Sequence, residues 1–245
     1  MSLVLEDVEW LFFDIDGTLL RTDQIAVKAY QEVIDQLRQE RLWDGEIPTV
    51  ADICSSFGYP IDEIWRRLLP EADPQIRQEA ARRAWKVEQQ RLAHGEGQLF
   101  EGVQETLTVL HARGYRLATA SNCNLDYLTF LERRFALRRW FDRLACSGGY
   151  QVSSKTALVA QLLQECQTHA AVMIGDRKTD IDAAHQNGIV AIGCAFGFGD
   201  AQELAEADIV IERFQELLTL LPGLSSDDVV PVVKSEVTWT EKGME

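Results

Sequence analysis

Residues 10–18 read WLFFDIDGT, and this short stretch decides the fold. Four large apolar residues in a row are typical of a strand that is buried on both faces, as in the centre of a parallel sheet. The polar residues begin where this strand ends, at Asp14. Functional side chains of open α/β sheets lie at the carboxyl ends of the strands. The stretch therefore predicts a central parallel strand that carries Asp14 and Asp16 to a site.

From Glu101 onward, helical and extended patterns alternate along the chain. The predicted helices are 103–112, 125–135, 156–166, 179–186 and 215–221, and the predicted strands between them are 115–120, 143–146, 171–174, 189–194 and 208–211. Such alternation is typical of right-handed βαβ units with helices on both faces of one sheet. The predicted fold class is therefore α/β, with a Rossmann-like parallel sheet as its core.

The block that follows the first strand has a different pattern. Residues 23–93 contain no convincing strand, and their apolar residues recur at helical spacing. The longest helix predicted there starts at Pro74 and stops before His94 and Gly95, as proline and glycine favour at the two ends of a helix. The expected organisation is an α/β core of residues 1–21 and 96–221, an all-helical cap of residues 22–95, and a C-terminal tail of residues 222–245.

Composition excludes several classes of protein. The chain has 245 residues, 46% of them hydrophobic and 26% charged, which is typical of a globular protein. Its net charge of −15 offers no attraction to nucleic acid or to an anionic membrane surface. No apolar run approaches the ~18 residues of a membrane span, and the first residues lack a signal peptide's basic start. We expect a cytoplasmic monomer or homodimer that binds a small molecule, without nucleic acid or membrane partners.

Polar residues of particular types follow four of the predicted strands. They are Asp14 and Asp16, Ser121, Lys155, and Asp176 with Asp180. Because the carboxyl ends of parallel strands share one edge of the sheet, these side chains should meet. Two aspartates spaced two apart on an extended backbone repel each other unless a cation binds between them. An isolated DxDG is more often an ordinary turn, so the combination carries the argument.

Taken together, four segments resemble the motifs of the haloacid dehalogenase superfamily, in the family's order. They are DIDGTLL at 14–20, ATASN at 118–122, SSKTAL at 153–158 and IGDRKTDIDAA at 174–184. The helical block resembles the inserted cap of the phosphoglycolate-phosphatase-like branch, and FGYPIDEIWRRL at 57–68 resembles its specificity loop. The resemblance covers residues 8–221. It implies a phosphoric monoester hydrolase of the phosphoglycolate phosphatase type.

The resemblance implies three catalytic residues. Asp14 would be the nucleophile that forms an aspartyl-phosphate, which divides a difficult hydrolysis into two easier steps. Asp16 would protonate the leaving alkoxide and then deprotonate the attacking water. Lys155 would neutralise charge on Asp14 and on the phosphate. Losing a preorganised charge of this kind typically reduces catalysis by ~100–1000-fold.

The resemblance also implies binding residues, a cofactor and a substrate class. Thr18 and Ser121 would donate hydrogen bonds to the phosphoryl group, with help from Asn122. Mg²⁺ would be the cofactor, held by oxygen ligands of Asp14, Asp16 (through its backbone carbonyl) and Asp176, with Asp180 orienting the set. The substrate would be a small phosphorylated metabolite.

Other activities are weighed on the same residues. A sugar phosphomutase of the β-phosphoglucomutase type shares Asp14 and Asp16, so it stays an alternative, as does a pyrophosphatase. A haloacid dehalogenase needs no acid at position 16. A phospho-receiver or binding module is the alternative without catalysis, but receivers have no helical insertion and do not need Asp16.

Further expectations concern residues around the predicted site. The loop 57–60 is the segment of the cap that should reach the site and influence the choice of substrate, through Tyr59. Arg177 and Lys178 should point outward along the helix after Asp176. Trp65 and Trp85 should serve packing in the core or cap rather than stack on a ligand.

Overall fold

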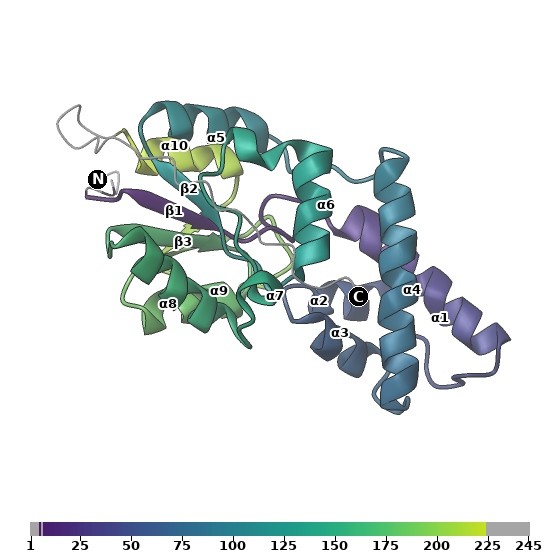
Figure 1. The fold of residues 1–245 in the computed structure, drawn as a ribbon. Helices are drawn as coiled ribbons and strands as arrows, with labels where there is room; N and C mark the ends of the chain where they lie inside the picture. Colours follow the sequence, from purple (N-terminus) through teal and green to yellow (C-terminus); the bar gives the residue numbers. More distant parts are fainter. Residues whose placement is uncertain (1–4, 6, 224–245) are drawn as a thin grey trace, which may run out of the picture.

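The computed structural model describes residue 5 and residues 7–223, and within them one parallel sheet lies beside a layer of helices (Figure 1). The sheet has five strands in the order β2-β1-β3-β4-β5. The strands are β1 (Trp10–Phe13), β2 (Arg116–Thr119), β3 (Ala171–Gly175), β4 (Val190–Cys194) and β5 (Ile209–Ile211). All pairs are parallel. The predicted α/β class is confirmed, with residues 10–13 as an inner strand.

Both faces of the sheet are covered by helices. The helices of this part are α5 (Val103–Ala112), α6 (Leu125–Phe135), α7 (Ser147–Tyr150), α8 (Lys155–Cys166), α9 (Lys178–Gln186) and α10 (Leu217–Leu220). Figure 1 shows α5 and α10 on one side of the sheet and α8 and α9 on the other. Leu11 and Phe13 of β1 belong to the apolar cluster on the side of α5 and α10, while Trp10 and Phe12 belong to the cluster on the side of α8 and α9. This two-sided burial explains why the strand is apolar at every position.

Two predicted elements differ from the structure. Residues 143–146 form only two isolated bridges to the β2 segment, Ala118 with Arg143 and Ser121 with Cys146, so the prediction of a strand there is wrong. The side chain of Thr119 bonds both the amide and the carbonyl of Ala145, which interrupts regular backbone pairing. The predicted helix 215–221 is a 3₁₀ turn, Phe214–Glu216, followed by α10.

Four helices between β1 and α5 form a layer of their own, which we call the cap. They are α1 (Asp23–Gln39), α2 (Val50–Ser56), α3 (Ile61–Leu68) and α4 (Pro74–Ala93). Their buried faces share one apolar cluster, which includes Val33, Trp65 and Ala80. In Figure 1 the long helices α1 and α4 lie side by side at one end of the molecule. The exact boundaries of core and cap, at residues 22 and 95, stay a prediction.

The expectation about the tail falls mostly on residues 224–245, which lie outside the described residues. Among the helices that are described, none is long and apolar enough to span a membrane.

Candidate active site

Three aspartates meet at the carboxyl end of the sheet. Asp14 follows β1, Asp176 follows β3, and Asp180 lies in the first turn of α9. All three are buried, and one carboxylate oxygen of each lies within 4.8 Å of those of the other two. Burial raises the pKa of Asp176 well above its usual value, and the charges of Asp14 and Asp180 raise it further. Such crowding of carboxylates favours a bound cation.

Lys155 supplies one positive charge to this cluster. It is the first residue of α8 and only 2% exposed. Its Nζ lies 2.8 Å from Asp14 Oδ2 and 2.5 Å from Asp180 Oδ1. Burial alone would lower the pKa of Lys155, but the two carboxylates outweigh burial and raise it. The structure thus places Lys155 beside the nucleophile that the sequence predicts.

Asp176 is held in place from several sides. The Thr18 hydroxyl donates to Asp176 Oδ1 at 3.1 Å, and the backbone N–H of Phe198 donates to Oδ2 at 2.7 Å. Gly17 has a φ of +86°, and a Cβ there would collide with the Asp176 carboxylate. Thr18 is fully buried, and its hydroxyl is directed at Asp176. Its predicted contact with the phosphoryl group stays a prediction.

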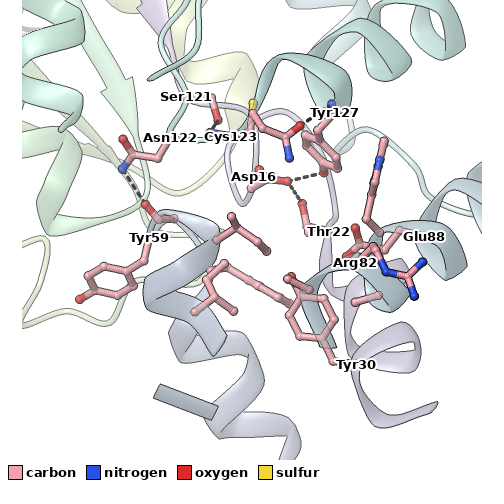
Figure 2. A pocket seen from close by; sticks show the side chains of 18 residues that line it. Asp16, Thr22, Tyr30, Tyr59, Arg82, Glu88, Ser121, Asn122, Cys123 and Tyr127 are labelled. Atoms are coloured by element: carbon pink, nitrogen blue, oxygen red, sulfur yellow. Dashed lines mark hydrogen bonds between the residues drawn. The ribbon is translucent and has the colours of Figure 1, made fainter. Parts of the chain in front are cut away.

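Asp16 points the other way, toward the cap (Figure 2). Its Oδ1 accepts hydrogen bonds from the Tyr127 hydroxyl at 2.7 Å and from the Thr22 hydroxyl. Burial raises the pKa of Asp16 to about 6, the nearby Asp14 adds to the rise, and the two hydrogen bonds oppose it. A carboxyl group that titrates near neutral pH can both give and take a proton, which suits a general acid and base.

A cavity of about 220 Å³ lies between core and cap, with Asp16 in its wall (Figure 2). Ser121 and Asn122 line it from the core, and their role in binding the substrate stays a prediction. Residues that the sequence did not single out for the site also line it, namely Tyr30, Glu88 and Tyr127. Trp85 lines it too and packs on Tyr127, with ring centroids 5.5 Å apart. Trp65 is fully buried, as expected for a packing residue, and the expectation that Trp85 packs rather than stacks on a ligand stays a prediction.

The loop 57–60 reaches the core. Asn122 Nδ2 donates to the carbonyl of Gly58 at 2.9 Å, and the Ser147 hydroxyl donates to Asn122 Oδ1 at 3.0 Å. Phe57, Gly58 and Tyr59 all line the cavity. The influence of Tyr59 on the choice of substrate stays a prediction.

Arg177 does not point outward, so that expectation is wrong. Its side chain is buried and donates to the carbonyl oxygens of Ser55 and Phe57 in the cap, while its Nε lies 2.9 Å from Glu203. The reason is the backbone conformation at Arg177. This residue is the N-cap of α9 and is extended, with a φ of −122°, so its side chain does not follow the direction of the helical side chains after it. Lys178 does lie at the surface, as expected, with its side chain 46% exposed.

Residues 11–194 match the model of the haloacid dehalogenase-like hydrolases. The chain belongs to this family. The matched region begins in β1 and ends with β4, so it includes the cap and every residue of the aspartate cluster. The predicted family and its enzymatic, phosphatase-type character are confirmed.

Curated relatives within the haloacid dehalogenase-like family have related names. A phosphoglycolate phosphatase of Synechococcus elongatus is 31% identical over 233 residues, which cover 87% of this chain and 97% of that protein. Pyrophosphatase PpaX of Listeria welshimeri is 24% identical, covering 86% and 95%. The structure of CbbY from Rhodobacter sphaeroides in complex with phosphate aligns with a TM-score of 0.72 at 24% identity, over 87% of this chain and 99% of that one. The last similarity supports the fold.

Proposed function

We propose that this haloacid dehalogenase-like hydrolase is a Mg²⁺-dependent phosphatase that hydrolyses a small phosphate monoester through an aspartyl-phosphate on Asp14. One observation carries the proposal. The buried Asp14 carboxylate is paired with Lys155 and lies in a cluster with Asp176 and Asp180, while Asp16, two residues on, opens into a cavity. A nucleophile, a compensating cation and a proton-transfer group thus lie together at one end of the sheet.

The donor set fits Mg²⁺. Three buried carboxylates with one lysine leave excess negative charge, and carboxylate oxygens are hard ligands of the kind that Mg²⁺ prefers. Asp14 and Asp176 would hold the ion together with the Asp16 backbone carbonyl, and Asp180 would orient Lys155 from behind. When bound, the ion would neutralise charge on the phosphoryl oxygens.

The chain's own residues account for both halves of the reaction. In the first half, an Asp14 oxygen forms a bond to phosphorus, the bond from phosphorus to the alcohol oxygen breaks, and Asp16 gives that oxygen its proton. In the second half, Asp16 takes a proton from water, the water oxygen bonds to phosphorus, and the bond to Asp14 breaks. Phosphate leaves, and both carboxyl groups return to their starting states.

Two further residues would bind the transferred group. Ser121 and Asn122 lie on the core side of the cavity, next to Asp16 in its wall, and each has a side chain able to donate a hydrogen bond. Asn122 already donates to Gly58 of the cap, so it would couple phosphate binding to the position of loop 57–60. Ser121 would therefore be the more direct phosphoryl ligand.

The test is phosphate release from p-nitrophenyl phosphate, with Mg²⁺ and with excess EDTA. We expect turnover with Mg²⁺ only. We also expect Asp14→Asn to lower the rate of phosphate release roughly 10³-fold or more, because the substitution removes the nucleophile. The matched control is Asp182→Asn, which alters an aspartate of the same region that pairs with Lys178 on the surface. Phosphate release by a well-folded Asp14→Asn protein at the wild-type rate would overturn the proposal.

A further inference from the structure

The cavity beside Asp16 has strongly aromatic walls. Trp85 of α4 and Tyr127 of α6 meet edge to face, with an angle of 62° between the rings. From the cap, Tyr30, Phe57 and Tyr59 complete these walls. Aromatic surfaces favour apolar or flat groups, which gain from leaving water. This is the space that the alcohol part of a phosphate ester would occupy, because Asp16 must reach the alcohol oxygen.

The charged residues of the same lining are mostly acidic. They are Asp16, Glu88 and Arg82. Glu88 of α4 is 8% exposed, and among the described residues no hydrogen bond or ion pair to its carboxyl group is found. Figure 2 shows Glu88 on the cap side of the cavity, across from Asp16. The cavity therefore presents two carboxyl groups to whatever enters it.

Arg82 does not balance them. Its side chain is 68% exposed, and its guanidinium is held by Glu79 through two hydrogen bonds of 2.8 and 2.9 Å. Lys155 is buried in the aspartate cluster, where it pairs with Asp14 and Asp180. Among the residues that line the cavity, all of them within the described part of the chain, no buried cation is left for a second anionic group. Burying an unpaired charge is strongly unfavourable.

From this we infer that the substrate is a phosphate monoester whose alcohol part is uncharged and carries an apolar or aromatic portion, selected by Trp85, Tyr127 and Glu88. The inference rests on the proposed function and narrows it. Phosphoglycolate, pyrophosphate and sugar bisphosphates each carry a second anionic group, which would face Asp16 and Glu88 without a partner. Such compounds are poor substrates of this chain.

The experiment compares two esters that differ in one charge: benzyl phosphate and 4-carboxybenzyl phosphate. We expect kcat/KM to be at least about tenfold higher for benzyl phosphate than for 4-carboxybenzyl phosphate. Such a selectivity corresponds to a tenfold difference in affinity. Ethyl phosphate against phosphoglycolate repeats the comparison without an aromatic ring. A carboxylated ester that is hydrolysed as well as its neutral partner overturns the inference.

Two variants connect the selectivity to the cavity. Trp85→Ala should lower kcat/KM for benzyl phosphate several-fold more than for ethyl phosphate. Above pH 8, where the Glu88 carboxyl group is ionised in the wild type, Glu88→Gln should narrow the gap in kcat/KM between the two benzyl esters by improving the carboxylated one. The control is Gln90→Ala, at an exposed position on the same helix. It should change neither the ratio of kcat/KM for benzyl to ethyl phosphate nor the ratio for the two benzyl esters. Equal losses on all esters in Trp85→Ala would contradict a role in choosing the alcohol.

Binding gives a second measurement that is independent of turnover. Calorimetric titration of the folded Asp14→Asn protein with each benzyl ester should show the same preference for the neutral one, and equal affinities would count against the inference. The two proposals can also fail separately. If p-nitrophenyl phosphate is hydrolysed but the neutral esters are not preferred, only the substrate inference is wrong. If no ester releases phosphate, the proposed function is wrong as well.

Discussion

The ammonium group of Lys155 lies 2.8 Å from the Asp14 carboxylate, and both side chains are only 1% exposed. A lysine at a helix N-terminus is placed against the helix dipole, so an unpaired, solvated lysine would be unfavourable there. Burial against two carboxylates explains the position instead. We expect Lys155→Ala to lower kcat/KM by ~100–1000-fold, the usual effect of losing one preorganised charge, as measured on p-nitrophenyl phosphate.

Lys178 provides the control for Lys155. It lies in the neighbouring helix α9, but its side chain is 46% exposed and pairs with Asp182 and Glu206 at the surface. Exposed ion pairs contribute little to stability, so Lys178→Ala should leave activity near the wild-type level. Activity that depends on Lys178 and survives the loss of Lys155 would contradict this assignment.

Asp14 and Asp176 of the aspartate cluster could be predicted because each directly follows a strand. An unbroken apolar run indicates a buried parallel strand, and Asp14 and Asp176 directly follow such runs. Once the strands are placed, the topology of a parallel sheet brings their carboxyl ends together. The prediction of a strand at 143–146 is wrong because the Thr119 hydroxyl bonds both the backbone amide and the backbone carbonyl of Ala145.

The substrate side of the site could not be predicted in the same way. Glu88 and Trp85 lie three residues apart on α4, a spacing that shows they share a helix face but not what that face meets. Tyr127 comes from α6 of the core, and its contact with Trp85 depends on how the cap lies over the sheet. Arg177 likewise contacts cap carbonyls more than 100 positions away in the chain. Such long-range contacts leave no local pattern.

Arg177 joins the loop after Asp176 to the cap, and this gives a second prediction. Arg177→Ala leaves the carbonyl oxygens of Ser55 and Phe57 and the carboxylate of Glu203 without their donor. Hydrogen bonds to charged groups contribute ~1.5–3 kcal/mol each, so we expect the free energy of unfolding to fall by about 2 kcal/mol or more. Because the cap would be held less firmly, KM should rise more than kcat falls.

Urea unfolding and steady-state kinetics on benzyl phosphate measure both effects. Arg213→Ala is the matched control, since the side chain of that arginine is 78% exposed and, within the described part of the chain, pairs only with Glu216. If Arg177→Ala and Arg213→Ala unfolded at the same urea concentration, with the same KM, the bridge to the cap would have no energetic importance.

Glu88 gives a prediction about pH. Burial, and next the charge of Asp16, raise the pKa of Glu88 from its usual value of 4.5 to about 8. Burial raises the pKa of Tyr30 and of Tyr127, which face the same space, and the charge of Glu88 adds to the rise in each. Between pH 4.5 and 8 the folded protein keeps a proton that the unfolded chain has released. The contribution of this group to stability therefore falls as pH rises through that range.

Glu88→Gln removes this pH dependence, because the amide stays neutral. The variant should gain up to about 3 kcal/mol of stability over the wild type as pH rises from 5.5 to 8, which is the part of the effect of the pKa difference that falls within this pH range. Urea unfolding of both proteins at the two pH values measures the gain. A difference in stability that is the same at pH 5.5 and pH 8 would mean that Glu88 ionises normally in the folded protein.

Gly17 and Gly188 have similar backbone conformations but different surroundings, so a comparison of their alanine variants gives the last prediction. Both have a positive φ, +86° and +70°, which is unfavourable for any residue with a Cβ. Around Gly188 a Cβ would meet nothing within 4 Å, whereas at Gly17 it would collide with the Asp176 carboxylate. Gly188→Ala should therefore lower the free energy of unfolding by about 1 kcal/mol and leave turnover intact.

Gly17→Ala carries the same backbone strain and in addition displaces a carboxylate of the proposed Mg²⁺ site. Asp176 has little room to yield, because Thr18 and the Phe198 amide bond its two oxygens and a Cβ at Gly197 would also collide with it. We expect turnover to fall at least ~100-fold, comparable to the loss of one preorganised charged group, and the Mg²⁺ concentration for half-maximal activity to rise. Titration of each folded variant with Mg²⁺ by calorimetry separates metal affinity from turnover. Wild-type Mg²⁺ affinity in Gly17→Ala would mean that Asp176 does not hold the ion, since that carboxylate cannot keep its position beside a new methyl group.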